Sequence, residues 1–476
     1  MYGGSHYTLS RGSDRMMELT PRLDLHSREP LYVQLYSFIK QEIETGKLTP
    51  YTKLPSKRKL SRYLQVSQNT IEAAYEQLVA EGYIEGISRK GYFVCKIEQT
   101  FSTLKESVMY IKEKAYENNV TFDFTQTGVD YDSFPFAIFR KISNDLLKDG
   151  NEHLLRIGHP QGEYELREAI VLYLYESRGV RASPSQVIIG SGTPTLIRLL
   201  FKLVKGSLYA VEDPGYHRRL VTFEKGDENV RLVPLDDDGM MISKLEDSNA
   251  DIAFVTPSHQ FPCGMIMPIS RRKQLLNWAQ KKDGRYIVED DYDSEFRYSG
   301  KPIPALQSLD CQERVIYMGT FSKALLPSLR ISYMVLPKPL IENYHENHFS
   351  LVQSVSRLDQ EIITKFMQEG YWEKHINKMR VVYRKKRDVL VSAISIYFPD
   401  SVEIIGLDSG LHLLVRPNNG MTEQELIERA EKYNIKVYPV SEYGQNDYQT
   451  VLLGFAALSE KEIHTAIQLL AKAWIR

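Results

Sequence analysis

Apolar residues near the N-terminus recur at helical spacing. One face of a first helix is marked by Leu31, Leu35, Ile39 and Ile43. Ser56 is a suitable N-cap for a second, short helix, because its side chain can accept a hydrogen bond from the first turn. A third helix is predicted to begin near Ser67, with a buried face made of Ile71, Ala74, Tyr75 and Leu78.

A short hairpin is predicted after the third helix, where apolar residues at 83–84 and 92–94 flank Gly86 and Gly91. Three helices followed by a hairpin make a winged helix-turn-helix, which places the start of its third helix against base edges of DNA. Gln and Asn can each form two hydrogen bonds with adenine. We therefore expect base contacts from Ser67, Gln68, Asn69 and Thr70.

Positive charge is concentrated around the second helix. No acidic residue interrupts the set formed by Lys53, Lys57, Arg58, Lys59 and Arg62. An isolated run of this kind is more often a solvated helix face. Beside a predicted recognition helix it favours phosphate contacts, and we include Ser56 in this surface. Arg89 and Lys90, at the tip of the predicted hairpin, could reach the minor groove.

From residue 121 onward the pattern changes to that of an α/β domain. Continuous apolar runs separated by helical segments predict a mostly parallel sheet that is covered on both faces. Seven such runs occur, at 187–190, 208–213, 230–235, 251–257, 285–290, 314–320 and 330–337. After about residue 345, long helices and the runs 411–415, 435–440 and 450–455 predict a smaller α+β subdomain.

These patterns divide the chain into four parts. We expect a flexible extension at 1–28, a winged-helix domain at 29–95, a polar linker at 96–120 and one large domain at 121–476. A formal net charge of −1 excludes a general basic field, so DNA contacts must come from a local patch. Three widely separated cysteines predict neither a disulfide framework nor a metal site, and a cytoplasmic protein without a membrane span is expected.

A candidate for covalent chemistry follows the run at 314–320. Lys323 lies at the end of this predicted strand and could form a Schiff base with an aldehyde. Ser322 and Arg330 could hold a phosphate, with Arg330 forming two parallel hydrogen bonds. Taken alone this spacing is weak, because most such lysines are simply exposed.

Acidic residues end the run at 285–290. A carboxylate at Asp290 could keep a pyridine nitrogen protonated, and Tyr292 could bond a ring hydroxyl. A metal site or a solvated acidic loop would fit the same residues. The lysine downstream favours pyridoxal 5′-phosphate (PLP).

Two further segments could complete such a site. Gly192 and Thr193 lie in a small-residue turn between a predicted strand and an apolar helix, where backbone N–H groups can face an anion. Plain helix capping is the alternative. Tyr216 follows another strand and could stack on a planar ring, or pack locally as an ordinary turn aromatic.

Taken together, these segments resemble known families. The stretch from 54 to 94 resembles the GntR winged-helix family, and the large domain resembles the fold-type I aminotransferases. The order of the two matches the MocR/GabR family of transcription regulators from about residue 29 almost to the end. The resemblance implies PLP as cofactor, operator DNA as partner and a head-to-tail homodimer.

The resemblance also implies residue roles. Lys323 would carry PLP, Asp290 would pair with the ring nitrogen and Tyr292 with the ring oxygen. Phosphate would be held by Gly192, Thr193, Ser322 and Arg330, and Tyr216 would lie near the ring. Arg218 and His259 would face the effector, which would be PLP itself, an amine or an amino acid.

Three departures from the enzyme pattern weaken the case for rapid transamination. Ala457 stands at the position where an arginine that binds the substrate carboxylate is expected. Ile157 or a neighbour stands where the enzymes usually have a tyrosine that reaches the phosphate. Residues 259–262 stand where the enzymes carry Asn-Pro. A methyl group cannot replace a charge-assisted bidentate pair. We therefore expect a PLP-bound regulator, with an active aminotransferase that carries an accessory DNA-binding module as the alternative. An enzyme-like domain retained only for dimerisation is the third interpretation.

Overall fold

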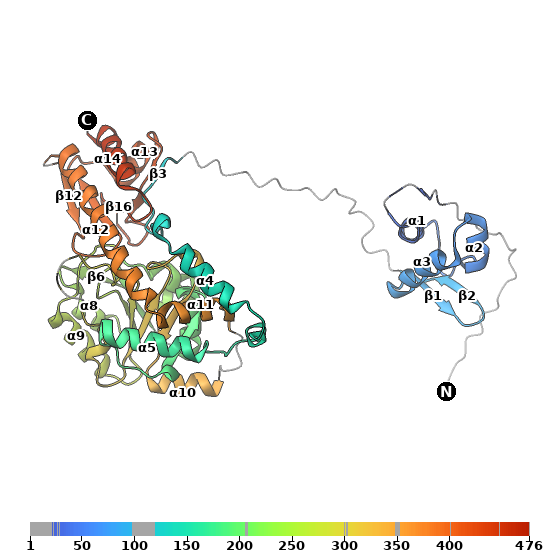
Figure 1. The fold of residues 1–476 in the computed structure, drawn as a ribbon, viewed down its shortest axis with the longest axis horizontal. Helices are drawn as coiled ribbons and strands as arrows, with labels where there is room; N and C mark the ends of the chain where they lie inside the picture. Colours follow the sequence, from blue (N-terminus) through green and yellow to red (C-terminus); the bar gives the residue numbers. More distant parts are fainter. Residues whose placement is uncertain are drawn as a thin grey trace. The chain divides into compact units, whose positions relative to one another are not determined.

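The computed structural model describes residues 21, 23–25, 27, 29–97, 120–204, 208–298, 300, 303–347, 353–399, 401–446 and 448–475. The chain divides into two compact units, Met1–Tyr116 and Glu117–Arg476 (Figure 1). The predicted extension 1–28 and linker 96–120 lie almost wholly outside the described residues.

The N-terminal unit has the predicted order of three helices and a hairpin. Its elements are α1 (Leu31–Glu44), α2 (Lys57–Leu64), α3 (Gln68–Ala80), β1 (Ile84–Ile87) and β2 (Gly91–Val94). The two strands pair antiparallel, from Ile84 opposite Val94 to Ile87 opposite Gly91. The unit is therefore a winged helix-turn-helix.

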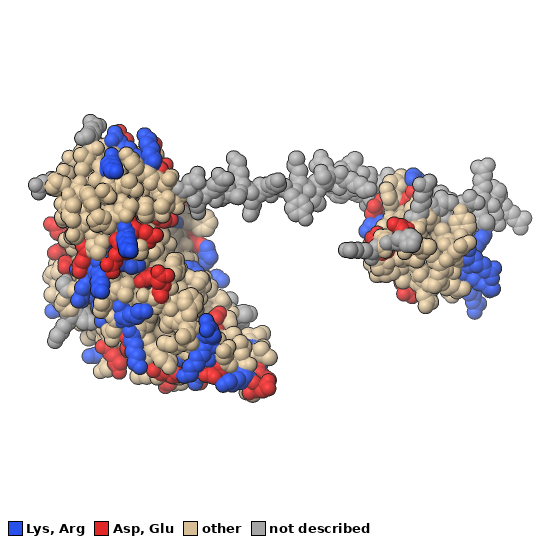
Figure 2. All heavy atoms as spheres, turned by 45° about the horizontal axis from the view of Figure 1, so that its top comes forward, with Lys and Arg blue, Asp and Glu red and all other residues tan. Residues whose placement is uncertain are grey.

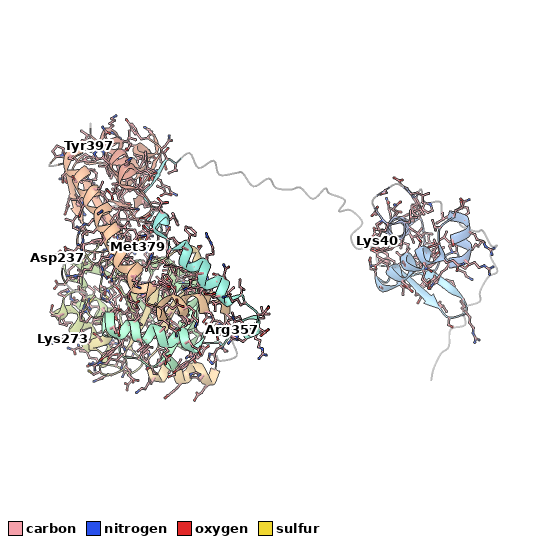
Figure 3. All side chains as sticks on the ribbon, viewed as in Figure 1. Lys40, Asp237, Lys273, Arg357, Met379 and Tyr397 are labelled. Atoms are coloured by element: carbon pink, nitrogen blue, oxygen red, sulfur yellow. The ribbon has the colours of Figure 1, made fainter. Side chains whose placement is uncertain are left out.

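Local chemistry explains where the helices begin and how the tight turn forms. Ser56 and Ser67 are the N-caps of α2 and α3, and their side chains accept hydrogen bonds from the backbone N–H of Lys59 and Thr70. Gln65 adopts a left-handed conformation (φ 56°) at the end of α2, which turns the chain sharply toward α3. Lys40 on α1, labelled in Figure 3, forms a 3.1 Å ion pair with Glu81 at the end of α3.

The apolar face predicted for α1 is the centre of this unit's core. Leu35 and Ile39 are fully buried and Ile43 nearly so, and they pack with the predicted face of α3. We expect Ile39→Ala to destabilise this unit by about 2–5 kcal/mol, because it leaves a cavity in a small core. Ile87→Ala, at a residue 39% exposed in β1, is the matched control and should have a much smaller effect.

The two units can be followed separately in the intact chain, because all three tryptophans, Trp278, Trp372 and Trp474, are buried in the large unit. Denaturation of Ile39→Ala monitored by far-UV circular dichroism should show an earlier partial transition. Tryptophan fluorescence should report an unchanged midpoint. If the fluorescence midpoint shifted as much as the circular dichroism transition, the two units would not unfold independently.

The large unit is built on one mixed sheet, with strand order β4-β11-β10-β9-β8-β5-β6-β7. All seven strands predicted from the sequence are present, and the two-residue β7, which was not predicted, makes an eighth. The strands are β4 (Val187–Gly190), β5 (Tyr209–Asp213), β6 (Val230–Asp236), β7 (Gly239–Met240), β8 (Ile252–Val255), β9 (Tyr286–Asp291), β10 (Val315–Thr320) and β11 (Ser332–Val335).

The central strands are parallel, while β11 runs antiparallel to both of its neighbours and β7 to β6. Alternate residues face opposite sides of the sheet. Ile188, Val288 and Ile316 belong to the apolar cluster on one face, whereas Ile287 and Val315 belong to the cluster on the other. The sheet is therefore covered on both faces, as continuous apolar strands require.

The helices of this part are α4 (Phe136–Leu146), α5 (Tyr164–Arg178), α6 (Thr193–Leu203), α7 (Arg218–Lys225), α8 (Ile242–Asp247), α9 (Ile269–Gln280), α10 (Lys338–Asn347) and α11 (Arg357–Gln368). Short 3-10 turns occur at Tyr131–Ser133, Glu152–Leu155, Pro184–Gln186, Asp227–Asn229, Gln307–Leu309 and Pro327–Leu329. No helix in the described part of the chain is long and apolar enough to cross a membrane.

A smaller subdomain follows the 27-residue helix α12 (Tyr371–Tyr397). Its four-stranded sheet has the order β12-β13-β16-β15. Its elements are β12 (Val402–Ile405), β13 (His412–Pro417), α13 (Glu423–Glu431), β14 (Ile435–Lys436), β15 (Tyr438–Pro439), β16 (Val451–Gly454) and α14 (Glu460–Trp474). The first strand of the large unit, β3 (Phe122–Asp123), pairs with β14, so both ends of this unit meet in the small subdomain.

Candidate functional site

A pocket of about 160 Å³ opens where the parallel strands β9 and β10 end and α6 begins. This is the edge of an α/β sheet at which ligands usually bind. All eight residues predicted to contact the cofactor line it: Gly192, Thr193, Tyr216, Asp290, Tyr292, Ser322, Lys323 and Arg330. They come from four segments that lie up to 138 positions apart in the chain, and the fold brings them together.

Lys323 is placed by the turn that follows β10. Its amine donates a hydrogen bond to the carbonyl oxygen of Gln126. Burial lowers the pKa of Lys323 to about 8, although the nearby carboxylates of Asp293 and Asp290 act in the opposite direction. At neutral pH this lysine therefore has a much larger neutral, nucleophilic fraction than a lysine with the ordinary pKa of 10.5.

This lowered pKa predicts how apo-protein reacts with PLP. Only the neutral amine attacks an aldehyde, so the rate of formation of the visible absorption band should rise through pH 8 and level off above it. A simple alkyl amine in solution is the control, and its rate should keep rising toward pH 10. If the rate for the protein rose with pH in the same way as the rate for the alkyl amine, the lowered pKa of Lys323 would be contradicted.

An anion-binding corner is formed by the start of α6 and the segment after β10. Gly192 precedes the first residue of α6, Thr193, and has a φ of 98°. A Cβ at Gly192 would lie 2.3 Å from Nη2 of Arg330, so the absence of a side chain lets the guanidinium approach the helix start. The buried hydroxyl oxygen of Ser322 has no hydrogen-bond partner among the described residues. These donors fit a phosphate group.

Asp290 lies on the floor of the pocket at the end of β9. Its carboxylate Oδ2 is 3.0 Å from Nε2 of His217, and both residues are almost fully buried. The pairing holds the carboxylate in one orientation and suits it to face a protonated ring nitrogen. This role of His217 was not predicted from the sequence, because His217 lies 73 positions from Asp290 and follows a different strand.

Aromatic side chains make the other walls. Tyr216, Phe261 and Tyr292 line the pocket, and the rings of Tyr216 and Phe261 meet edge to face with centroids 5.8 Å apart. Phe261 also contacts the ring of Tyr443 from the small subdomain. Such walls suit a planar ring and exclude water from it.

The two residues predicted to face the effector do not line this pocket. The guanidinium of Arg218 donates a hydrogen bond to the carbonyl oxygen of Gly444 in the small subdomain. His259 is 2% exposed and lies behind Tyr292, with its Nδ1 near Asp293. The effector role of both residues remains a prediction, although His259 does contact the lining residue Tyr292 through its Nδ1.

Several lining residues were not predicted from the sequence: Gln126, Thr127, Pro194, Phe261, Thr320, Pro327 and Ser332. Gln126 and Thr127 lie about 200 positions before Lys323, in a segment without a recognisable motif. Phe261 was considered only as a departure from the enzyme pattern. A signal for it was present, because it follows a predicted strand at the same edge as the other candidates.

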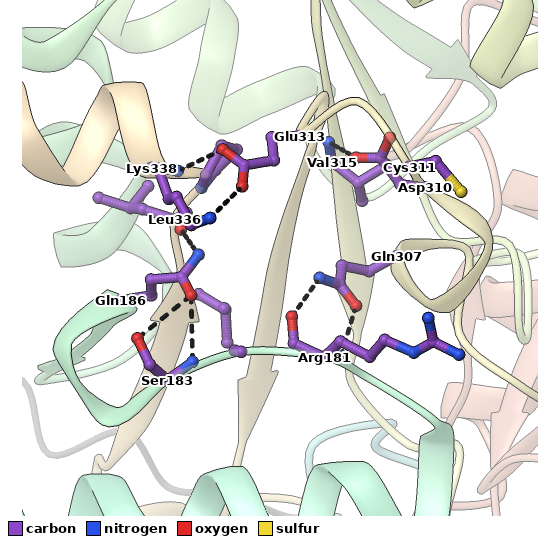
Figure 4. A pocket seen from close by; sticks show the side chains of 13 residues that line it. Arg181, Ser183, Gln186, Gln307, Asp310, Cys311, Glu313, Val315, Leu336 and Lys338 are labelled. Atoms are coloured by element: carbon purple, nitrogen blue, oxygen red, sulfur yellow. Dashed lines mark hydrogen bonds and ion pairs between the residues drawn. The ribbon is translucent and has the colours of Figure 1, made fainter.

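A second cavity, of about 390 Å³, lies at the opposite edge of the sheet, where β10 begins and β11 ends (Figure 4). Several of its polar side chains form hydrogen bonds or ion pairs within the lining. Gln186 bonds Ser183 and the carbonyl of Leu336, and Glu313 pairs with Lys338 (Figure 4). No predicted site residue lines it, and we assign it no function.

The predicted DNA-binding residues of the N-terminal unit lie in and just before α2, at the start of α3 and on the wing. Ser56, Arg58, Lys59, Arg62 and Tyr63 surround one hollow on its surface. Figure 2 shows Lys and Arg gathered on one edge of this unit. Exposed side chains include Lys53, Gln68, Asn69, Arg89 and Lys90, which leaves them accessible to a ligand.

Two of the predicted DNA contacts are partly engaged within the protein. The amine of Lys57 forms an ion pair with Glu72 on α3. The hydroxyl of Thr70 bonds that of the N-cap residue Ser67. Lys57 is thus less available for phosphate than the exposed Arg58.

Comparison with known proteins gives the same division of the chain. Residues 31–94 match the gntR family of bacterial regulatory proteins. Residues 130–470 match the family of class I and II aminotransferases. The chain is 45% identical over 462 residues to the uncharacterized HTH-type transcriptional regulator YdeL of Bacillus subtilis, covering 96% of this chain and 100% of that protein. It is 30% identical to the probable rhizopine catabolism regulatory protein MocR of Rhizobium meliloti, covering 95% of each.

Solved structures agree on the large unit. A Pyrococcus horikoshii kynurenine aminotransferase superposes with a TM-score of 0.66 and 27% identity over 75% of this chain and 90% of that one. The winged helix expected from the pattern and the aminotransferase fold expected from the resemblance are both confirmed. The chain belongs to the family of transcription regulators that join a GntR-type winged helix to a class I and II aminotransferase domain.

Proposed function

We propose that this regulator binds PLP covalently on Lys323 and that occupancy of this site controls its binding to operator DNA. The observation that carries the proposal is that the fold gathers eight residues of separate segments around one pocket with a lysine of lowered pKa. PLP supplies an aldehyde for the lysine, a phosphate and a ring that withdraws electrons.

The chain's own residues provide one partner for each of these groups. The donors at Gly192, Thr193, Ser322 and Arg330 would hold the phosphate. Asp290, fixed by His217, would keep the ring nitrogen protonated. Tyr216 and Phe261 would cover the ring and exclude water.

The proposed effector is PLP itself, or an amino compound that has no carboxylate requiring an arginine partner. Ala457 offers only a methyl group where the family's enzymes are expected to carry arginine. An ideal Cβ at Gly128 would lie 2.6 Å from the Ala457 Cβ, so little room is left between the two segments. Arg218 already donates to the Gly444 carbonyl, and an acidic effector would have to displace that bond.

Occupancy of the pocket would change operator affinity by shifting the equilibrium between two arrangements of the DNA-binding units. A ligand can shift such an equilibrium only by its difference in affinity for the two states. We propose a head-to-tail homodimer in the cytoplasm as the functional form. In it, the Ser67–Thr70 segment would enter the major groove, and Arg58, Lys59 and Arg62 would contact phosphates.

The deciding experiment is an electrophoretic mobility shift of the full-length apo-protein with DNA from upstream of its own gene, with and without PLP. A PLP-dependent change in affinity is expected. Absence of specific DNA binding under both conditions would overturn the proposal. Sustained keto-acid production from any amino donor would instead support the aminotransferase alternative.

A further inference from the structure

A buried group of polar side chains lies directly behind Tyr292. His259 follows β8, and Tyr292 and Asp293 follow β9. Because β8 and β9 are adjacent and parallel, their carboxyl-end loops meet at the same edge of the sheet. His259 and Asp293 are each 2% exposed, so both depend on protein partners rather than on water.

Among the described residues, all hydrogen-bond contacts of the His259 ring are made by one of its two nitrogens. Nδ1 lies 3.1 and 3.0 Å from the two carboxylate oxygens of Asp293 and 2.9 Å from the hydroxyl oxygen of Tyr292. Nε2 is buried and has no partner among the described residues. An ionised carboxylate can only accept, so the ring hydrogen belongs on Nδ1.

This tautomer fixes the role of the Tyr292 hydroxyl. A protonated Nδ1 has no free lone pair, so the hydroxyl oxygen of Tyr292 can only accept from it, sharing the hydrogen with Asp293. The hydroxyl keeps its own hydrogen, because burial and the negative charges of Asp293 and Asp290 raise the pKa of Tyr292. Within the described residues no protein acceptor receives this hydrogen, and Tyr292 lines the cofactor pocket.

The surrounding fold holds the His259 ring in place. Gly410 packs so closely that a Cβ there would lie 1.9 Å from Cε1 of His259. His412, with its ring centroid 5.2 Å away, donates from Nε2 to the carbonyl of Pro262. Burial lowers the pKa of His412 to about 3, so it is neutral and adds no charge to the pair.

We infer that His259, oriented by Asp293, is a positioning residue that makes the Tyr292 hydroxyl a fixed hydrogen-bond donor to the ring oxygen of PLP. The inference rests on the proposed function, because it requires PLP in the pocket. It gives His259 a role behind the cofactor in place of the effector contact expected from the resemblance.

The test is a pH titration of the visible absorption band of full-length, PLP-loaded protein. A donor to the ring oxygen stabilises its negative charge and so favours the deprotonated form of the bound cofactor. His259→Leu should therefore raise the midpoint of the titration by about one pH unit, the size expected when one hydrogen bond to a charged oxygen is lost. Tyr292→Phe should shift it in the same direction.

The double variant distinguishes positioning from a separate effect. If His259 acts only through Tyr292, the midpoint of His259→Leu/Tyr292→Phe should equal that of Tyr292→Phe. His259→Asn should largely restore the wild-type midpoint, because its amide N–H can replace Nδ1–H. His464→Leu, at an exposed histidine on α14, is the matched control.

Each outcome has a definite meaning. An unchanged midpoint in His259→Leu, or additive shifts in the double variant, would overturn the positioning role and leave the proposed function intact. If His259→Leu does not fold, His259→Ala, which also lacks a donor, takes its place in the comparison. Failure of the wild-type protein to form any Lys323-dependent band would overturn the proposed function itself.

The same cluster could be mistaken for a metal site, since atoms of His259, Asp293 and His412 lie within 4.8 Å of one another. A metal on Nδ1 would remove the hydrogen that His259 donates. Stoichiometric zinc in the purified protein, lost together with the wild-type midpoint on chelation, would therefore overturn the inference. The hydrogen-bonded arrangement predicts that chelation leaves the midpoint unchanged.

Discussion

Lys323→Ala is expected to eliminate the visible PLP band and the effect of PLP on DNA binding. The lysine supplies the only amine that lines the described pocket, so PLP would be held there by non-covalent contacts alone. The protein should still fold, because Lys323 lines the pocket and does not belong to the apolar core cluster. Absorbance spectra and mobility shifts with and without PLP are the measurements.

Two comparisons make this result specific. Lys202→Ala, at an exposed lysine on α6, should leave the spectrum and the PLP response unchanged. Arg330→Ala should retain the band but weaken PLP binding by about 10- to 150-fold, because it removes charge-assisted hydrogen bonds worth about 1.5–3 kcal/mol. A Lys323→Ala protein that kept a stable band would show that another amine carries the cofactor.

Asn69→Ala is expected to produce the largest loss in operator affinity. Asn69 is exposed in the first turn of α3, where a recognition helix meets base edges. Loss of one bidentate base contact costs about 1–3 kcal/mol, or about 5- to 150-fold in affinity. Binding to unrelated DNA should change little, because that term depends on phosphate contacts.

Gln77→Ala is the control for this variant, because Gln77 lies on the same helix but near its opposite end, where its amide bonds Glu81. Arg62→Ala provides the opposite signature. It should weaken binding to all DNA sequences. It should also reduce the slope of the logarithm of affinity against the logarithm of salt concentration by about one. Equal losses on operator and unrelated DNA in Asn69→Ala would argue against base recognition by this residue.

Local sequence pattern was sufficient for most secondary structure. The apolar spacing of α1 and α3 and the caps Ser56 and Ser67 depend on residues only a few positions apart, and the structure has them as expected. The seven longer strands of the large sheet were equally visible, because each is a continuous apolar run. The two-residue β7 was not, since so short a strand carries no periodicity.

The chemical groups of the pocket were predictable for the same reason. Lys323 and Ser322 adjoin one strand end, and Asp290 and Tyr292 another, so the sequence showed that these residue types occur at strand ends. It did not show which ends meet. That depends on the order of strands in the sheet, which places β9 beside β10.

The sequence by itself thus determined the two kinds of unit, their order and the lysine, carboxylate and arginine available for PLP. Only the tertiary structure decided that His217 holds Asp290, that Gln126 joins the pocket, and that His259 lies behind Tyr292. These pairs are separated by 33 to 197 positions. No spacing rule reaches that far, because such contacts are set by strand order and loop packing rather than by the geometry of any one element.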